Sequence, residues 1–171
     1  RNIRQGMAPS SSGSTLFVYG SLQSEEVLRS LLRRVPASLP ASLPAYRRFR
    51  VAGRDYPGIS ASVEEASSVV DGRVLFGLLD DEVCMLDAFE GDEYEKTPVT
   101  VETVDADADA KDAVQTEAYV YVGEATTQSW DYGAFRSHHL AGFLAMCDEW
   151  CLEYRGESKG KGIGEHIGRE T

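Results

Sequence analysis

Apolar positions near the start of the chain follow two different patterns in succession. Residues 16–19, Leu-Phe-Val-Tyr, form a short continuous apolar run that is typical of a buried strand. Apolar side chains then recur at helical spacing: Val27, Leu28, Leu31, Leu32 and Val35. Ser24 is a suitable N-cap for such a helix, and the acidic Glu25 and Glu26 suit its first turn. The pattern therefore predicts a strand, a tight loop and a helix.

The middle of the chain favours extended structure. Three prolines make a continuous helix unfavourable: Pro36, Pro40 and Pro44. Three later segments have strand patterns: residues 46–51, 59–63 and 69–78. The first two flank a turn over residues 53–58. Within the third, Gly72 or Gly77 is expected at a bend, a bulge or a close backbone approach.

A short helix that ends in a glutamate is predicted next. Either Asp80 or Asp81 is expected to cap it. Apolar residues at a spacing of three mark its buried side: Val83, Leu86 and Phe89. Glu90 follows directly, and Gly91 is expected to end the helix.

The last third predicts two strands and a helix. Residues 95–104 and 115–122 have strand patterns, with Val99 and Val101 on one face of the first. Side chains then recur at helical spacing: Phe135, His139, Leu140, Phe143, Leu144, Cys147, Cys151 and Tyr154. This predicts one long C-terminal helix packed across the sheet. Because strands and helices do not alternate regularly, the predicted fold class is α+β, with a mainly antiparallel sheet curled toward a barrel.

The chain length and the polar ends predict one domain over residues 15–155. Residues 1–6 precede the first methionine, Met7, and are interpreted as an addition from recombinant expression. Residues 1–14 as a whole are expected to form a disordered leader rather than a signal peptide. Residues 156–171 are glycine-rich and charged, which predicts a mobile tail. No run approaches the roughly 18 apolar residues of a membrane span, so a cytoplasmic protein without membrane contact is expected.

Charge and cysteine content narrow the classes of function. A formal net charge of -11 argues against a protein that binds nucleic-acid phosphates. Three cysteines without an export signal indicate no disulfide framework. Cys147 and Cys151 lie four apart but lack a second ligand pair, so we expect buried thiols and no metal site. The aspartate run at 105–112 lacks the glycine and glutamate of a calcium loop and is expected to be an exposed hairpin turn.

Two features carry candidate chemistry. Gly20 and Ser21 follow a buried strand and precede a helix, where free backbone N–H groups form a cradle for an anion. Glu90 follows an apolar stretch and precedes a glycine. It is either a proton shuttle with a raised pKa or a solvated residue at a helix end. The adjacent His138 and His139 point about 100° apart on a helix, so we expect surface or packing roles for them.

Two motifs together resemble the gamma-glutamylcyclotransferase superfamily. They are residues 17–22, Phe-Val-Tyr-Gly-Ser-Leu, and residues 86–94, Leu-Asp-Ala-Phe-Glu-Gly-Asp-Glu-Tyr. The likeness is strongest to its branch of avirulence-induced-gene (AIG-type) proteins and gamma-glutamylamine cyclotransferases. Segments 53–59, 72–75 and 130–132 support it in the expected order. The resemblance implies a small barrel with flanking helices and one small-molecule pocket built by the two motifs.

The resemblance also assigns site residues. The family's acid/base glutamate falls on Glu90, and a tyrosine near the pocket falls on Tyr94. Its substrate loop falls on Tyr19, Gly20, Ser21, Leu22, Gln23 and Ser24. The implied reaction is cyclisation of a gamma-glutamyl amine or peptide: the substrate's own α-amine attacks the side-chain carbonyl, and 5-oxoproline and a free amine are released. Such a reaction uses neither a cofactor nor a metal.

Some alternatives stay open at this point. One is a ligand-binding or regulatory module of the same fold without turnover, and another is a related acyltransferase or amide hydrolase. The chain has no extended substrate-covering insertion between Val63 and Val69, which leaves the leaving amine open. Four aromatic residues are interpreted as core or pocket wall: Tyr119, Tyr121, Trp130 and Trp150.

Overall fold

A computed structural model of the chain describes residues 13–62, 67–104 and 111–156. The N-terminal strands and helices are β1 (Ser14–Val18), η1 (Ser21–Gln23), α1 (Glu25–Leu32), β2 (Ser38–Pro44), β3 (Tyr46–Arg50) and β4 (Pro57–Ala61). The remaining elements are β5 (Val69–Leu78), α2 (Asp80–Glu90), η2 (Gly91–Glu93), β6 (Tyr94–Val104), β7 (Lys111–Tyr121), α3 (Tyr132–His138) and α4 (Leu140–Tyr154). Most of the expected leader, tail and acidic turn, and residues 63–66, lie outside the described residues.

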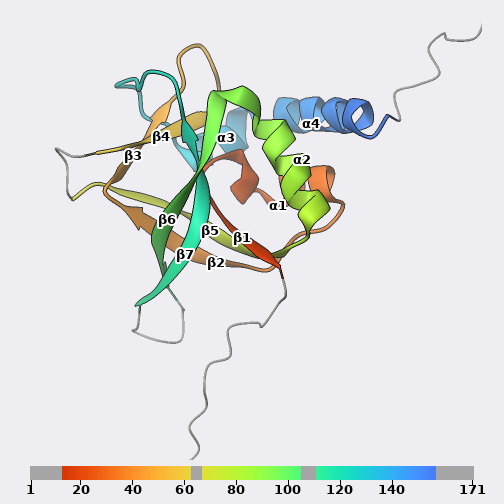
Figure 1. Cartoon of the computed structure of the whole chain (residues 1–171). Coiled ribbons are helices and arrows are strands. Elements are labelled where there is room, and N and C mark those ends of the chain that lie inside the picture. Colours follow the sequence, from red (N-terminus) through yellow and green to blue (C-terminus); the bar gives the residue numbers. More distant parts are fainter. Residues whose placement is uncertain (1–12, 63–66, 105–110, 157–171) are drawn as a thin grey trace, which may run out of the picture.

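Five strands close into a barrel in the order β1-β5-β2-β6-β7. The β1–β5, β5–β2, β2–β6 and β6–β7 pairs are antiparallel, and β1 closes the barrel by parallel pairing with β7. β3 and β4 form a separate antiparallel hairpin, which lies away from α1 and α2 (Figure 1). The predicted α+β class with a mainly antiparallel barrel is therefore confirmed.

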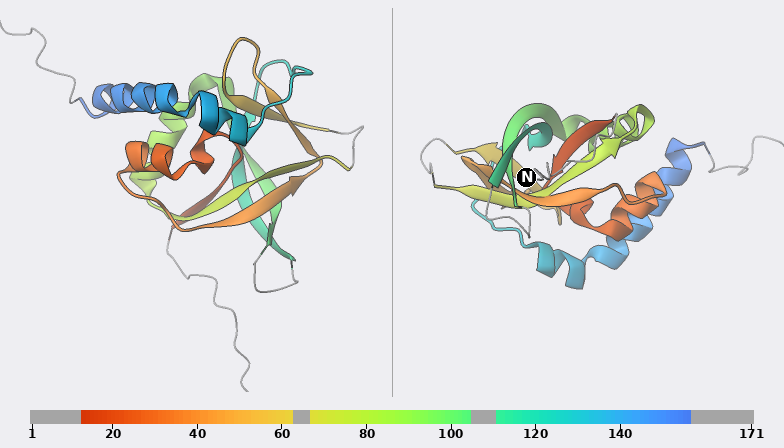
Figure 2. Two further views of the ribbon diagram at one scale, coloured as in Figure 1. Left: turned by 180° about the vertical axis from the view of Figure 1, so that it is seen from behind. Right: turned by 90° about the horizontal axis from the view of Figure 1, so that it is seen from below.

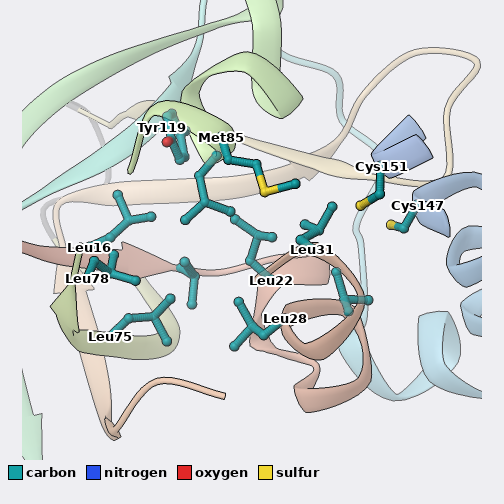
Figure 3. Packing of buried hydrophobic residues seen from close by; sticks show 13 residues of the cluster. Leu16, Leu22, Leu28, Leu31, Leu75, Leu78, Met85, Tyr119, Cys147 and Cys151 are labelled. Atoms are coloured by element: carbon teal, nitrogen blue, oxygen red, sulfur yellow. The ribbon is translucent and has the colours of Figure 1, made fainter. Parts of the chain in front are cut away.

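Both faces of β1 are buried, which explains its continuous apolar run. Phe17 packs in the barrel interior with the inward residues of the other strands. Leu16 and Val18 point the other way, into a second cluster that α1, α2 and α4 cover. Figure 3 shows this second cluster, with Leu28 and Leu31 of α1 between the strand residues and the cysteines of α4. A strand with two apolar environments cannot show the alternation of a half-exposed strand.

Helices α1, α2 and α4 lie on the same side of the barrel (Figures 1 and 2). Ser24 caps α1 as predicted, because its hydroxyl accepts a hydrogen bond from the N–H of Val27 at 3.3 Å. The close approach expected at a glycine of β5 occurs at Gly72, where a Cβ would lie 2.2 Å from the carbonyl oxygen of Val18. Within the described residues, no helix is long and apolar enough to cross a bilayer.

Two predictions about helices are wrong. The single long C-terminal helix is two helices, with a break at His139, whose φ of -124° is not helical. The break lets Phe135 stay buried while its ring meets that of Phe143 edge to face at 5.3 Å. α4 then packs against α1 instead of across the sheet. The N-cap of α2 is Leu79, and neither Asp80 nor Asp81 occupies that position, because Glu82 accepts the hydrogen bond from the Leu79 N–H at 2.9 Å.

Candidate active site

A cavity of about 170 Å³ opens where β1, α2, β6 and α4 come together. Tyr19, Gly20, Ser21 and Leu22 line one side of it. Glu90 and Tyr94 line another. The two motifs, which lie about seventy residues apart in the sequence, thus meet at one hollow, as the resemblance implied. Gln23 and Ser24 are not in the lining.

The loop after β1 turns sharply through η1. The N–H of Gln23 donates to Gly20 O at 3.1 Å, and the N–H of Ser24 donates to Ser21 O at 3.0 Å. The preceding N–H groups, on Ser21 and Leu22, find no carbonyl acceptor among the described residues. They are the free donors that begin any helical turn, and both residues line the cavity. The loop is therefore able to bind an anionic oxygen.

Two neighbours from the β3–β4 hairpin hold this loop. Arg48 donates from Nη1 to Tyr19 O at 2.9 Å and to Asp71 O at 3.0 Å, which ties the end of β1 to β5. Pro57 packs so closely on Gly20 that a Cβ there would lie 2.8 Å from the proline Cγ. A larger residue at position 20 would displace either the turn or Pro57.

Gln23 and Ser24 have local roles in the turn. Gln23 folds back, with its side-chain amide 3.4 Å from Gly20 O. Ser24 is fully buried, caps α1 and donates its hydroxyl proton to Glu26 at 2.7 Å. The structure therefore brings together four of the six residues expected in the substrate loop.

Glu90 is the last residue of α2, and its side chain lines the cavity in a half-buried position. Among the residues that the structure describes, it has neither a hydrogen-bond donor nor a cationic partner. Loss of hydration, together with the negative charge of Glu93, raises the pKa of Glu90 to about 8. A carboxyl group with this pKa exchanges protons near neutral pH, which favours the proton-shuttle interpretation.

Three tyrosines surround the glutamate, and each donates its hydroxyl proton elsewhere. Tyr19 donates to Tyr119 O at 2.5 Å, and Tyr94 donates to Pro57 O at 2.7 Å. Tyr119 donates to Asp87 at 2.7 Å. Burial is the main cause that raises the pKa of all three, so they stay neutral. Their hydroxyl oxygens can still accept a hydrogen bond, which suits an amine or ammonium group in the cavity.

Asp87 fixes the end of α2 one turn before Glu90. One carboxylate oxygen accepts from Tyr119, and the other accepts from Lys96 Nζ at 2.8 Å. The two partners come from β7 and β6, so the network pins the helix to the barrel. Asp87 is part of the motif that carries the resemblance, but sequence alone did not identify its partners.

The other candidate residues have structural surroundings. Cys147 and Cys151 are buried, as expected, and burial raises the pKa of Cys147 to about 12. His138 and His139 are exposed, and His139 Nδ1 lies 3.5 Å from Asp55. Among residues 13–62, 67–104 and 111–156, no three His, Cys, Asp or Glu side chains cluster closely enough to hold a metal ion.

Sequence reasoning missed part of the lining. Tyr56 ends the turn between β3 and β4, and Pro57 begins β4; the resemblance included both only within a supporting segment. Phe143 and Met146 come from α4, where helical spacing marked Phe143 as apolar without showing what it faces. Trp150 was expected in the core or a pocket wall and lies in the cavity wall. Glu93, exposed at the rim, accepts a hydrogen bond from Tyr56 at 2.6 Å.

Comparison with known proteins finds similarity to one family. Residues 16–137 match the family model described as gamma-glutamyl cyclotransferase, AIG2-like. AIG2-like protein D of Arabidopsis thaliana is 39% identical over 142 residues, which cover 81% of this chain and 90% of that protein. A protein of Arabidopsis thaliana solved in solution is 30% identical with a TM-score of 0.59, over 85% of this chain and 93% of its own.

A solved gamma-glutamyl cyclotransferase has the same fold. It superimposes with a TM-score of 0.54 over 92% of this chain and 93% of its own, at 18% identity. At that identity the likeness concerns the fold alone. The match includes the barrel and the flanking helices.

Proposed function

Since this chain belongs to the AIG2-like family of gamma-glutamyl cyclotransferases, we propose that it releases 5-oxoproline and a free amine from a gamma-glutamyl amine or peptide, with Glu90 as general acid and base. The observation that carries this proposal is the Glu90 carboxyl group. It lines the cavity, lacks a partner among the described residues and has a pKa of about 8. Among the described residues, a glutamate in this state forms no hydrogen bond or ion pair that would stabilise the fold.

The reaction needs one proton carrier. The substrate's α-amine attacks its γ-carbonyl carbon, so a C–N bond forms and closes a five-membered ring. Ionised Glu90 first takes one proton from the bound α-ammonium group, which frees the amine for this attack. Glu90 then passes that proton to the departing nitrogen as the original amide C–N bond breaks, and it relays a second proton from the ring nitrogen to the released amine, which leaves as an ammonium ion. Atoms balance without water, and Glu90 returns to its starting state.

The loop and the tyrosines supply binding. The free N–H groups of Ser21 and Leu22 suit either the substrate's α-carboxylate or the oxyanion that develops on the carbonyl. The tyrosine oxygens around Glu90 suit the α-amine. Because the attack is intramolecular, a pocket that holds the glutamyl chain folded removes roughly 7 kcal/mol or more of the barrier. No cofactor or metal has a step in this scheme.

Glu90 is mostly protonated in the empty site at neutral pH, since its pKa is about 8. A bound α-ammonium group would stabilise the carboxylate and lower that pKa. Substrate binding then supplies both the charge that ionises Glu90 and the proton that it takes up. We therefore expect kcat/KM to rise with pH toward about 8, as the free enzyme gains its base.

Incubation with a panel of gamma-glutamyl compounds tests the proposal, with 5-oxoproline measured by mass spectrometry. The natural protein should form it, and Glu90→Gln should form it at least about 100-fold more slowly. Glu95→Gln is a matched control, because Glu95 is exposed on β6 and outside the cavity lining. Equal 5-oxoproline formation by Glu90→Gln would refute the role of Glu90. Tight binding of these compounds without turnover would instead favour a ligand-binding module.

A further inference from the structure

One wall of the cavity is not used by the proposed chemistry. Phe143, Met146 and Trp150 line it, and their spacing of three and four places them on one face of α4. Phe89 of α2 adjoins them in the lining. All three α4 residues lie beyond residues 16–137, the part of the chain that matches the family model. The α4 part of this wall therefore lies outside the stretch that the family model matches.

The wall is a rigid aromatic surface. The ring of Phe89 meets that of Trp150 edge to face, at 5.1 Å and 81°, and that of Phe143 at 6.2 Å and 86°. Tyr154, which is outside the lining, stacks on Trp150 at 4.8 Å and 15°. Such edge-to-face contacts hold each ring in place before a ligand arrives. Met146 completes the wall with an exposed thioether, and methionine adapts well to aromatic partners.

The cavity lining contains no cation among the described residues. Its charged members are Glu90 and Glu93. The cations behind the lining are engaged, because Arg48 bonds Tyr19 O and Lys96 bonds Asp87. The free N–H groups of the loop can bind one carboxylate of a gamma-glutamyl substrate. A second carboxylate, on the leaving amine, would lie near the negative charge of Glu93 without a cationic partner among the described lining residues.

We propose that the wall formed by Phe89, Phe143, Met146 and Trp150 is the subsite for the leaving amine, and that it selects an arylalkylamine without a carboxylate. This inference rests on the proposed function and deepens it. With the glutamyl part held by the loop and Glu90, the leaving group extends toward α4. An aromatic ring there covers Met146 and meets the edges of Phe89 and Phe143. An amino-acid leaving group would carry a carboxylate that finds no cation among the described residues of the lining.

Three matched substrates separate the contributions of the ring and the carboxylate. They are gamma-glutamyl-2-phenylethylamide, gamma-glutamyl-ethylamide without the ring, and gamma-glutamyl-phenylalanine with the carboxylate added. We expect kcat/KM for the phenylethylamide to exceed that of each of the others by about tenfold or more. Equal values for all three would overturn the inference and leave the proposed function standing. Absence of 5-oxoproline from every substrate would overturn both.

Variants of α4 test the wall itself. Met146→Ala should lower the kcat/KM ratio of phenylethylamide to ethylamide about three- to tenfold. Leu152→Ala is the matched control, since Leu152 is exposed on the same helix and outside the lining, and its ratio should equal that of the natural protein. Met146→Lys supplies the missing cation and should raise the relative kcat/KM for gamma-glutamyl-phenylalanine. A ratio that Met146→Ala leaves unchanged, or no gain with Met146→Lys, would contradict the assignment.

Discussion

The two ends of α2 place a glutamate in opposite environments. Glu82, in the first turn, is 7% exposed and forms a two-pronged ion pair with Arg34, including a 2.8 Å bond from Arg34 Nε. Burial acts to raise the pKa of Glu82, but the hydrogen bonds from Arg34 and from the Leu79 N–H, with the charge of Arg34, lower it overall. Glu90, in the last turn, has no such partner among the described residues, and its pKa rises to about 8.

This difference shows what separates a carboxylate that stabilises the fold from one that can exchange a proton near neutral pH. Both side chains lose water, so burial alone does not distinguish them. The cationic partner distinguishes them. Arg34 holds Glu82 ionised, whereas the pKa of Glu90 stays close to neutral pH, where a carboxyl group can exchange its proton. The position along the helix adds to the contrast, because a carboxylate is favoured at the N-terminal end of the helix dipole and disfavoured at the C-terminal end.

The largest expected effect comes from removing the charge of Glu90, at the C-terminal end of α2. Glu90→Gln keeps the shape of the side chain but cannot accept a proton, so kcat should fall by about 100- to 10,000-fold. Steady-state release of 5-oxoproline measures it, and circular dichroism checks that the variant folds. A loss smaller than about tenfold would mean that another group moves the proton.

The same change at Glu82, near the N-terminal end of α2, should affect stability instead of activity. Glu82→Gln breaks the ion pair and leaves Arg34 without its partner, which should cost about 1–2 kcal/mol of unfolding free energy. The expected loss is small because the Arg34 side chain is 42% exposed to solvent, which screens the pair. Chemical denaturation measures the loss. The control Glu102→Gln breaks an exposed pair with Lys111 at 3.6 Å and should change stability by less than about 0.5 kcal/mol.

A third prediction concerns the pH dependence of stability. The pKa of Glu90 is raised from 4.5 to about 8 in the folded state, so between these values the native protein holds a proton that the unfolded chain has released. The contribution of Glu90 to the free energy of unfolding therefore falls as the pH rises from about 4.5 to 8. Glu90→Gln removes the penalty and should be more stable than the natural protein by about 1–2 kcal/mol at pH 9.

Thermal unfolding at pH 4 and pH 9 measures this difference. The natural protein and Glu90→Gln should have nearly the same unfolding temperature at pH 4, where Glu90 is mostly protonated in both the folded and the unfolded state. A stability gain for Glu90→Gln that does not depend on pH would show that burial of the charge is not its cause.

The smallest effect is expected just beyond the end of α2. Tyr94 donates to Pro57 O at 2.7 Å and so links β6 to the turn that packs on Gly20. Tyr94→Phe removes this bond and should cost about 0.5–1 kcal/mol of stability, with a few-fold rise in KM. Tyr154→Phe is the matched control, because Tyr154 is 45% exposed and outside the lining. Identical stability losses in the two variants would argue against a role for the Pro57 contact.

The sequence predicted the features that depend on local pattern. The buried strand at 16–19, the Ser24 cap and the helix that ends at Glu90 all follow from periodicity and capping. The break at His139 could not be predicted, because helical spacing continues through it and the bend depends on how Phe135 meets Phe143. The partners of Asp87 and the α4 wall of the cavity are likewise contacts between residues far apart in the chain.

The pKa of Glu90 is the quantity on which the account depends most directly. Carbon NMR of side-chain carboxyl groups in glutamate-labelled protein can follow it, with Glu90→Gln and Glu82→Gln identifying the two signals. We expect Glu90 to titrate near pH 8 and Glu82 to titrate below the ordinary pKa of a glutamate. Titration of Glu90 at or below pH 4.5 would contradict this expectation.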